Sequence, residues 1–68
     1  MPIRVTLNGV PREFPVPLTF AQLLHEMELA GRRLAVERNG EIVPRSRFGD
    51  AHLADGDRVE VVMAVGGG

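Results

Sequence analysis

The stretch LADGDRVEVVMAVGGG (residues 53–68) contains the run that decides the fold. After a turn at Asp55-Gly56-Asp57, residues 58–65 place apolar side chains on both faces of an extended chain. Val59, Val61 and Met63 lie on one face, and Val62 and Ala64 lie on the other. A strand that is apolar on both faces is typical of the centre of a sheet. We therefore expect a central strand from about Arg58 to Val65, followed directly by three glycines.

The first seventeen residues predict a hairpin. IRVTL (residues 3–7) alternates apolar and polar side chains, the period of a strand with one buried face. Asn8-Gly9 then favours the positive φ angles of a tight turn. The next run, VPREFPVP (residues 10–17), contains prolines that cannot donate a ladder hydrogen bond, so we expect this second strand at a sheet edge.

A helix start is encoded in LTFAQLL (residues 18–24). Thr19 is the predicted N-cap, and Gln22 three residues later completes a capping box, so the helix begins near Phe20. We expect it to end at Gly31, which accepts the left-handed conformation found after helices. One apolar stripe at helical spacing should face a sheet, and it consists of Phe20, Leu23, Leu24 and Met27.

The second half of the chain predicts another hairpin and a loop. LAVERNGEIV (residues 34–43) reads as a strand, a turn at Asn39-Gly40 and a short strand. PRSRFGDAHL (residues 44–53) contains a helix-breaking proline and mixed polar residues. We expect an irregular loop or a turn of helix there, anchored by Phe48 and Leu53.

These elements predict an α+β fold in which two hairpins flank one helix. The apolar first and last strands are best satisfied as parallel neighbours at the sheet centre, with the helix across one face. This is a ubiquitin-like β-grasp arrangement, a mixed sheet of ββαββ order. Residues 1–68 then form a single domain, with a flexible glycine tail at residues 66–68.

Composition excludes several classes of function. The chain has no cysteine, so disulfides, thiolate metal sites and cysteine nucleophiles are ruled out. Its net charge of −1 gives no electrostatic footprint for nucleic acid or a membrane surface. No charged and apolar leader precedes Ile3, so we expect a cytoplasmic protein that is a monomer when free.

The candidate polar residues have structural interpretations. Asp55 and Asp57 surround a glycine and are expected to accept hydrogen bonds from their own turn rather than bind a metal. His25 and His52 have no catalytic partner at motif spacing. Two short basic clusters, Arg32-Arg33 and residues 45–47, are either solvated surface or a docking contact to an acidic partner.

The glycine tail is the remaining candidate for chemistry. Terminal glycines fray easily, so the tail is either slack or the working end of the molecule. In the second case the reactive group is the α-carboxylate of Gly68, which becomes electrophilic once it is joined to AMP. Glycines have no Cβ to obstruct a narrow channel in an activating enzyme. Extended, Ala64 to Gly68 would reach on the order of 16 Å, at about 3.3 Å per residue.

Three stretches resemble the ThiS family of sulfur carrier proteins in thiamine biosynthesis: LNG (residues 7–9), VERNGEIVPRS (residues 36–46) and the stretch from 53 to 68. The resemblance implies a β-grasp carrier that is not an enzyme and binds no cofactor. A ThiF-type adenylyltransferase would use ATP and Mg²⁺ to adenylate Gly68. Sulfur from a persulfide donor would then give a thiocarboxylate for thiazole synthase. The partner-binding tail would comprise Ala64, Val65, Gly66 and Gly67.

Three alternatives stay open from the sequence. The small subunit of molybdopterin synthase shares the fold and the thiocarboxylate chemistry but delivers sulfur to a pterin. A ubiquitin-type modifier would be joined to target lysines, although this chain has no lysine of its own for building lysine-linked chains. A plain interaction domain would carry the same tail without using it.

Overall fold

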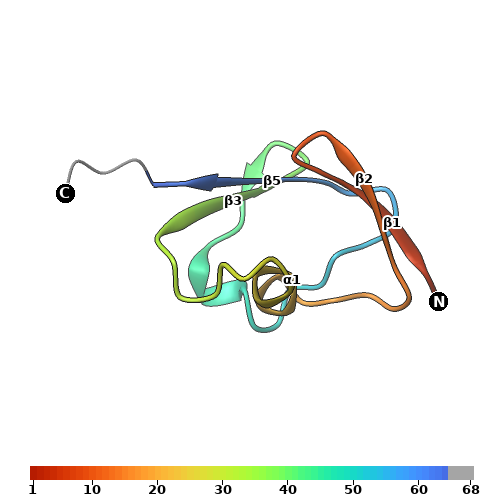
Figure 1. Cartoon of the computed structure of the whole chain (residues 1–68), viewed down its shortest axis with the longest axis horizontal. Coiled ribbons are helices and arrows are strands. Elements are labelled where there is room, and N and C mark those ends of the chain that lie inside the picture. The colour runs from red at the N-terminus through yellow and green to blue at the C-terminus, as the bar shows by residue number, and fades with distance from the viewer. Residues whose placement is uncertain (65–68) are drawn as a thin grey trace.

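The computed structural model describes residues 1–64, and Val65, Gly66, Gly67 and Gly68 lie outside the described residues. One five-stranded sheet, in the order β2-β1-β5-β3-β4, is crossed on one face by the only α-helix of this part of the chain (Figure 1). The elements are β1 (Ile3–Leu7), β2 (Val10–Phe14), α1 (Phe20–Glu26), β3 (Leu34–Arg38), β4 (Glu41–Ile42), the 3-10 turn η1 (Arg45–Arg47) and β5 (Arg58–Met63).

The strand pairing is that of the β-grasp fold. The first and last strands are parallel neighbours, with Leu7 opposite Val59. β5 also pairs antiparallel with β3, where Val36 lies opposite Val61. β1 and β2 form the first hairpin, β3 and β4 form the second, and β2 is an edge strand. The predicted parallel pairing, the edge position of β2 and both hairpins are confirmed.

The core lies between α1 and the sheet. Phe20, Leu23 and Leu24 of the predicted helical stripe are buried, whereas Met27 is partly buried beside them. The sheet and the loop before β5 supply the other buried side chains: Ile3, Val5, Leu7, Phe14, Val36, Leu53, Val59 and Val61.

The second face of the sheet is open. Val62 is 53% exposed, and its neighbour across the strands, Ala35, is also exposed. β5 is therefore a central strand, as its apolar pattern predicts, but only one of its two apolar faces is covered by another layer within residues 1–64.

The helix begins as predicted. The Thr19 hydroxyl accepts a hydrogen bond from the Gln22 backbone N–H at 3.0 Å. The Gln22 side chain in turn accepts one from the Thr19 N–H at 2.9 Å, which completes the capping box.

The predicted helix end at Gly31 is wrong. The helix ends at Glu26, and Glu28 takes the left-handed conformation with a φ of 60°. The N–H of Leu29 bonds to the carbonyl of Leu24 at 2.8 Å, and that of Glu28 bonds to His25 at 3.0 Å, the two bonds of a Schellman motif. Leu29 packs against the core, so its burial outweighs the preference for glycine at the left-handed position.

The predicted turns are confirmed. Asn8-Gly9 and Asn39-Gly40 both have positive φ angles. The 44–53 segment contains η1 and irregular backbone, with Phe48 partly buried and Leu53 buried. Within residues 1–64, no helix is long and apolar enough to span a membrane.

Candidate functional site

The end of β5 is where the described chain approaches the predicted tail. β5 ends at the side of the molecule opposite the N-terminus (Figure 1). Met63 pairs with Leu34, and the N–H of Ala64 then bonds to the carbonyl of Arg33 at 3.0 Å. We call Arg33, Met63 and Ala64 the tail root. Of the predicted tail residues, the structure places only Ala64, which is exposed.

Asn8 holds β5 from the side of β1. The Asn8 side chain accepts a hydrogen bond from the N–H of Val61 at 2.8 Å, and its amide donates to the Val61 carbonyl at 3.4 Å. The backbone N–H of Asn8 also bonds to the carbonyl of Val59 at 2.9 Å. The side chain thus continues the parallel pairing of β1 and β5 beyond Leu7.

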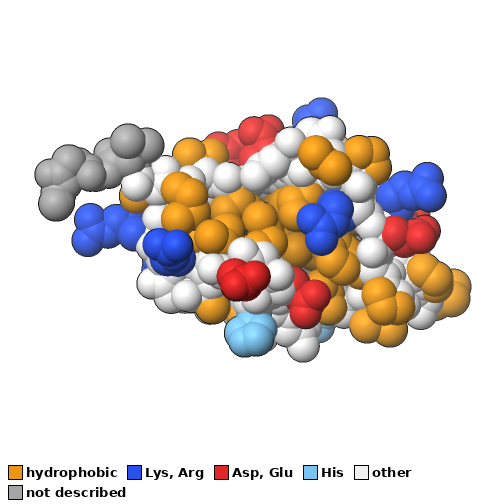
Figure 2. Space-filling model, viewed as in Figure 1, with side chains coloured by type: hydrophobic (Ala, Val, Ile, Leu, Met, Phe, Trp, Pro, Cys, Tyr) orange, Lys and Arg blue, Asp and Glu red, His pale blue; other side chains and the backbone are white. Residues whose placement is uncertain are grey.

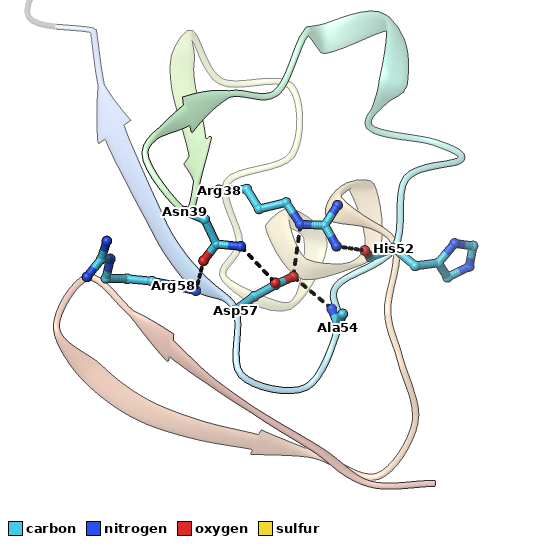
Figure 3. Close-up of polar contacts among 6 residues, drawn as sticks. All are labelled: Arg38, Asn39, His52, Ala54, Asp57 and Arg58. Atoms are coloured by element: carbon cyan, nitrogen blue, oxygen red, sulfur yellow. Dashed lines mark hydrogen bonds and ion pairs between the residues drawn. The ribbon is translucent and has the colours of Figure 1, made fainter.

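Asp57 holds the start of β5 from the side of β3 (Figure 3). Asp57 is 7% exposed, and its carboxylate accepts three hydrogen bonds. Oδ2 accepts from Arg38 Nε at 2.9 Å and from the Ala54 N–H at 2.8 Å. Oδ1 accepts from Asn39 Nδ2 at 3.1 Å, and Asn39 Oδ1 accepts from the Arg58 N–H at 2.8 Å.

Arg38 connects this cluster to the loop before β5 and to the core. Its Nη2 donates to the carbonyl of His52 at 2.9 Å. The guanidinium carbon lies 5.6 Å from the centre of the Phe20 ring, within the range of a cation–π contact. Because its carboxylate accepts three hydrogen bonds from these partners, Asp57 has a structural role.

The structural interpretation of the Asp55-Gly56-Asp57 turn is confirmed with one change. Asp57 closes the turn through its N–H to the Ala54 carbonyl at 3.0 Å, and its side chain accepts the Ala54 N–H. Asp55 instead accepts the N–H of Arg4 at 2.8 Å, so it ties the turn to β1 rather than bonding within it.

Neither histidine side chain takes part in the hydrogen bonds of the Asp57 cluster. His25 is exposed in the last turn of α1. The imidazole of His52 points away from the Asp57 cluster (Figure 3). Across residues 1–64, no three His, Cys, Asp or Glu side chains gather as they would around a metal ion.

Sequence reasoning missed Arg38 and the side-chain role of Asn8. Each Asn-Gly pair predicts a tight turn, and the positive φ angle of that turn already explains why Asn8 and Asn39 are asparagines. Nothing further in the sequence indicated that their side chains bond to another strand. For Arg38 the available signal was its place just before the second turn, at the end of a strand that must lie beside the last one.

The ThiS name is shared by a matching family model, a solved structure and a sulfur carrier protein. The ThiS family model matches residues 5–68. A crystal structure of the thiamine biosynthesis protein ThiS from Geobacter metallireducens superposes with a TM-score of 0.82 at 33% identity, covering 97% of this chain and 100% of that one. The sulfur carrier protein ThiS of Bacillus subtilis is 40% identical over 50 residues, which is 74% of this chain and 76% of that protein.

A further similarity is to part of a longer protein. The thiazole synthase of Paramagnetospirillum magneticum is 41% identical over 66 residues, and these cover 97% of this chain but 20% of that protein. The chain thus spans about a fifth of that relative. With the family model covering all but the first four residues and a β-grasp sheet that matches a ThiS structure, the chain belongs to the ThiS family of sulfur carrier proteins in thiamine biosynthesis, and it is a carrier rather than an enzyme.

Proposed function

We propose that the α-carboxylate of Gly68 is the group that carries sulfur. A carboxylate oxygen attacks the α-phosphorus of ATP in a ThiF-type adenylyltransferase, which releases pyrophosphate and leaves an acyl-adenylate. The outer sulfur of a persulfide attacks the acyl carbon and displaces AMP. A thiol then reduces the remaining S–S bond, and the chain ends in a thiocarboxylate. ATP and Mg²⁺ belong to the activating enzyme.

The observation that carries this proposal is the way β5 ends. β5 is bonded on both sides, by Asn8 and by β3, and its last described residue, Ala64, is exposed. A carrier requires its terminus to be presented at a fixed place while the domain itself stays intact. Within residues 1–64 every buried side-chain nitrogen and oxygen has a hydrogen-bond partner, which supports placing the chemistry at the terminus.

Thiazole synthase is the proposed recipient of the sulfur. In Paramagnetospirillum magneticum, the segment similar to this chain lies within a protein named thiazole synthase. Joining a carrier to its acceptor in one chain raises their effective concentration, which is useful when the two react with each other. This favours thiazole synthase over the large subunit of molybdopterin synthase as the partner.

Intact mass spectrometry tests the chemistry directly. The chain is incubated with a ThiF-type enzyme, ATP, Mg²⁺ and sulfide, and we expect a mass gain equal to exchanging one oxygen for one sulfur. Deleting Gly67 and Gly68 should abolish the gain, and Gly67→Val should act similarly by placing a β-branched side chain where the channel expects none.

Thermal unfolding of the same variants is the control. The midpoint should hardly change, because the buried core is built from residues 3–61. A truncated chain that gains sulfur at the yield of the parent would contradict the proposal. So would a full-length chain that gains none from an enzyme shown to be active on another carrier.

A further inference from the structure

Two basic clusters that are separate in the sequence meet beside the tail root. Nη2 of Arg45 donates to the backbone carbonyl of Arg32 at 3.3 Å. The next carbonyl, that of Arg33, accepts the N–H of Ala64. All three arginines are exposed, and Figure 2 shows Lys or Arg side chains gathered at the end of the molecule where β5 ends. We call Arg32, Arg33 and Arg45 the basic collar.

The collar is not neutralised by carboxylates of the described chain. The ion pairs within residues 1–64 are made by Arg4, Arg38 and Arg47, and none includes a collar arginine. Arg47 belongs to the same sequence cluster as Arg45 but pairs with Asp50 at 2.9 Å. The positive charge of the collar is therefore local, on a chain whose net charge is −1.

Distance decides what the collar contacts. Extended, Ala64 to Gly68 spans roughly 16 Å, so a terminus inserted into an active site lies that far from the tail root. Charges are largely screened beyond a Debye length of about 8 Å at physiological ionic strength. The collar is thus too far from bound ATP to act on its phosphates. When the tail is inserted, the collar faces the surface of the adenylating enzyme around the entrance to its active site.

We propose that the basic collar docks on carboxylates around the entrance to the active site of the adenylating enzyme. The inference rests on the proposed function, because it assumes that such an enzyme takes up the tail. Exposed charges at the rim of an interface act mainly on the association rate and make it sensitive to salt. The collar accordingly determines how readily the enzyme captures the carrier, while the chemical step depends on the terminus.

Two charge-matched double variants test this. Arg32→Glu with Arg33→Glu alters the collar, and Arg12→Glu with Arg58→Glu alters exposed arginines that make no ion pair within residues 1–64. Arg58 begins β5, at the opposite end of that strand from the tail root. Each pair of changes lowers the net charge by the same amount. A difference in KM between the two variants therefore shows that the position of the arginines matters, not the net charge alone. The assay is ATP–pyrophosphate exchange by the ThiF-type enzyme against carrier concentration, at low and high salt.

We expect the collar variant to raise the KM for the carrier about 10-fold or more at low salt with kcat retained, and to flatten the salt dependence. The control pair should stay within about 2-fold of the parent, and Arg32→Lys with Arg33→Lys should restore most of the lost capture because it restores the charge. Circular dichroism melting checks that every variant is folded, and Arg45→Glu provides an independent single change in the collar.

Equal losses in the collar and control variants would overturn the inference, because net charge alone would then explain them. Unchanged KM in both collar variants would overturn it as well. If the parent chain supports no exchange with an enzyme active on another carrier, the proposed function itself fails. That result is distinguishable from the failure of the collar, in which the parent chain remains a substrate.

Discussion

Asp57→Asn should destabilise the fold through a single misplaced amide. The carboxylate oxygen Oδ2 accepts from two donors, Arg38 Nε and the Ala54 N–H, so the oxygen of the new amide must take that position. Its nitrogen then occupies the place of Oδ1, which lies 3.1 Å from Asn39 Nδ2. Two donors face each other there. Turning the Asn39 amide over would sacrifice its bond from the Arg58 N–H.

The expected loss follows from these contacts. A buried donor left without an acceptor costs about 1–3 kcal/mol. The Arg38 bond also loses its charged acceptor, and bonds to charged groups are stronger than neutral ones by roughly 1 kcal/mol. The total is about 2–4 kcal/mol. At about 0.05–0.15 kcal/mol per residue, a domain of this length has on the order of 3–10 kcal/mol of stability, so the loss is a large share of it.

Asn39→Asp provides the matched rescue. Alone, it brings a second carboxylate against Asp57 at a position 3.1 Å away, which should also destabilise the fold by repulsion. Combined with Asp57→Asn, it restores a donor facing an acceptor, and its other oxygen still accepts the Arg58 N–H. Aspartate tolerates the left-handed backbone at this position, where φ is 51°. The double variant should recover about 2 kcal/mol or more relative to the sum of the single changes.

Urea denaturation of the four proteins measures this coupling. The chain has no tryptophan and no tyrosine, so unfolding is best followed by far-ultraviolet circular dichroism. Single-variant losses that simply add in the double variant, within about 0.5 kcal/mol, would refute the hydrogen-bond geometry assigned to Asp57 and Asn39.

Other changes test the core, the cap and the strand clamp by the same unfolding assay. Leu24→Ala should cost about 2–5 kcal/mol because it leaves a cavity in the core, whereas Val62→Ala on the open face should cost far less; equal losses would contradict the assigned burial. Thr19→Ala removes the N-cap and should lower the free energy of unfolding by about 1 kcal/mol. An unchanged free energy of unfolding would show that the cap does not form in solution. Asn8→Gly keeps the turn but removes the side-chain bonds to Val61, so amide exchange at Val61 should accelerate; unchanged exchange would show that the clamp does not form.

Local patterns predicted most of the fold because each is a short-range constraint. Thr19 and Gln22 are three residues apart, and their capping box fixes the helix start without help from the rest of the chain. The two Asn-Gly pairs define tight turns in the same way. The parallel pairing of β1 and β5 was predicted from these elements together, because the first and the last strand are both apolar and are best buried as neighbours at the sheet centre.

The helix end and the polar clusters depend on tertiary contacts and could not be predicted so well. Leu29 ends the helix early because it packs against the core, and that packing depends on the tertiary structure. Arg38 and Asp57 are 19 residues apart, and Asn8 and Val61 are 53 apart. The pattern of a single sequence does not specify which distant polar side chains bond to each other. The tail residues Val65 to Gly68 lie outside the described residues, so their predicted roles stay predictions.

The asparagines of the two Asn-Gly turns both bond to β5 through their side chains, which a turn alone does not require. Glycine in place of Asn8 or Asn39 would adopt the positive φ of these turns at least as easily. Asparagine adds a side chain, and in both turns it bonds to β5: Asn8 to Val61 from one side, and Asn39 to Arg58 from the other. β5 is thus held along its length before it reaches the tail root. A partner that captures the terminus then loses no free energy in ordering this strand, which is how preorganisation raises affinity.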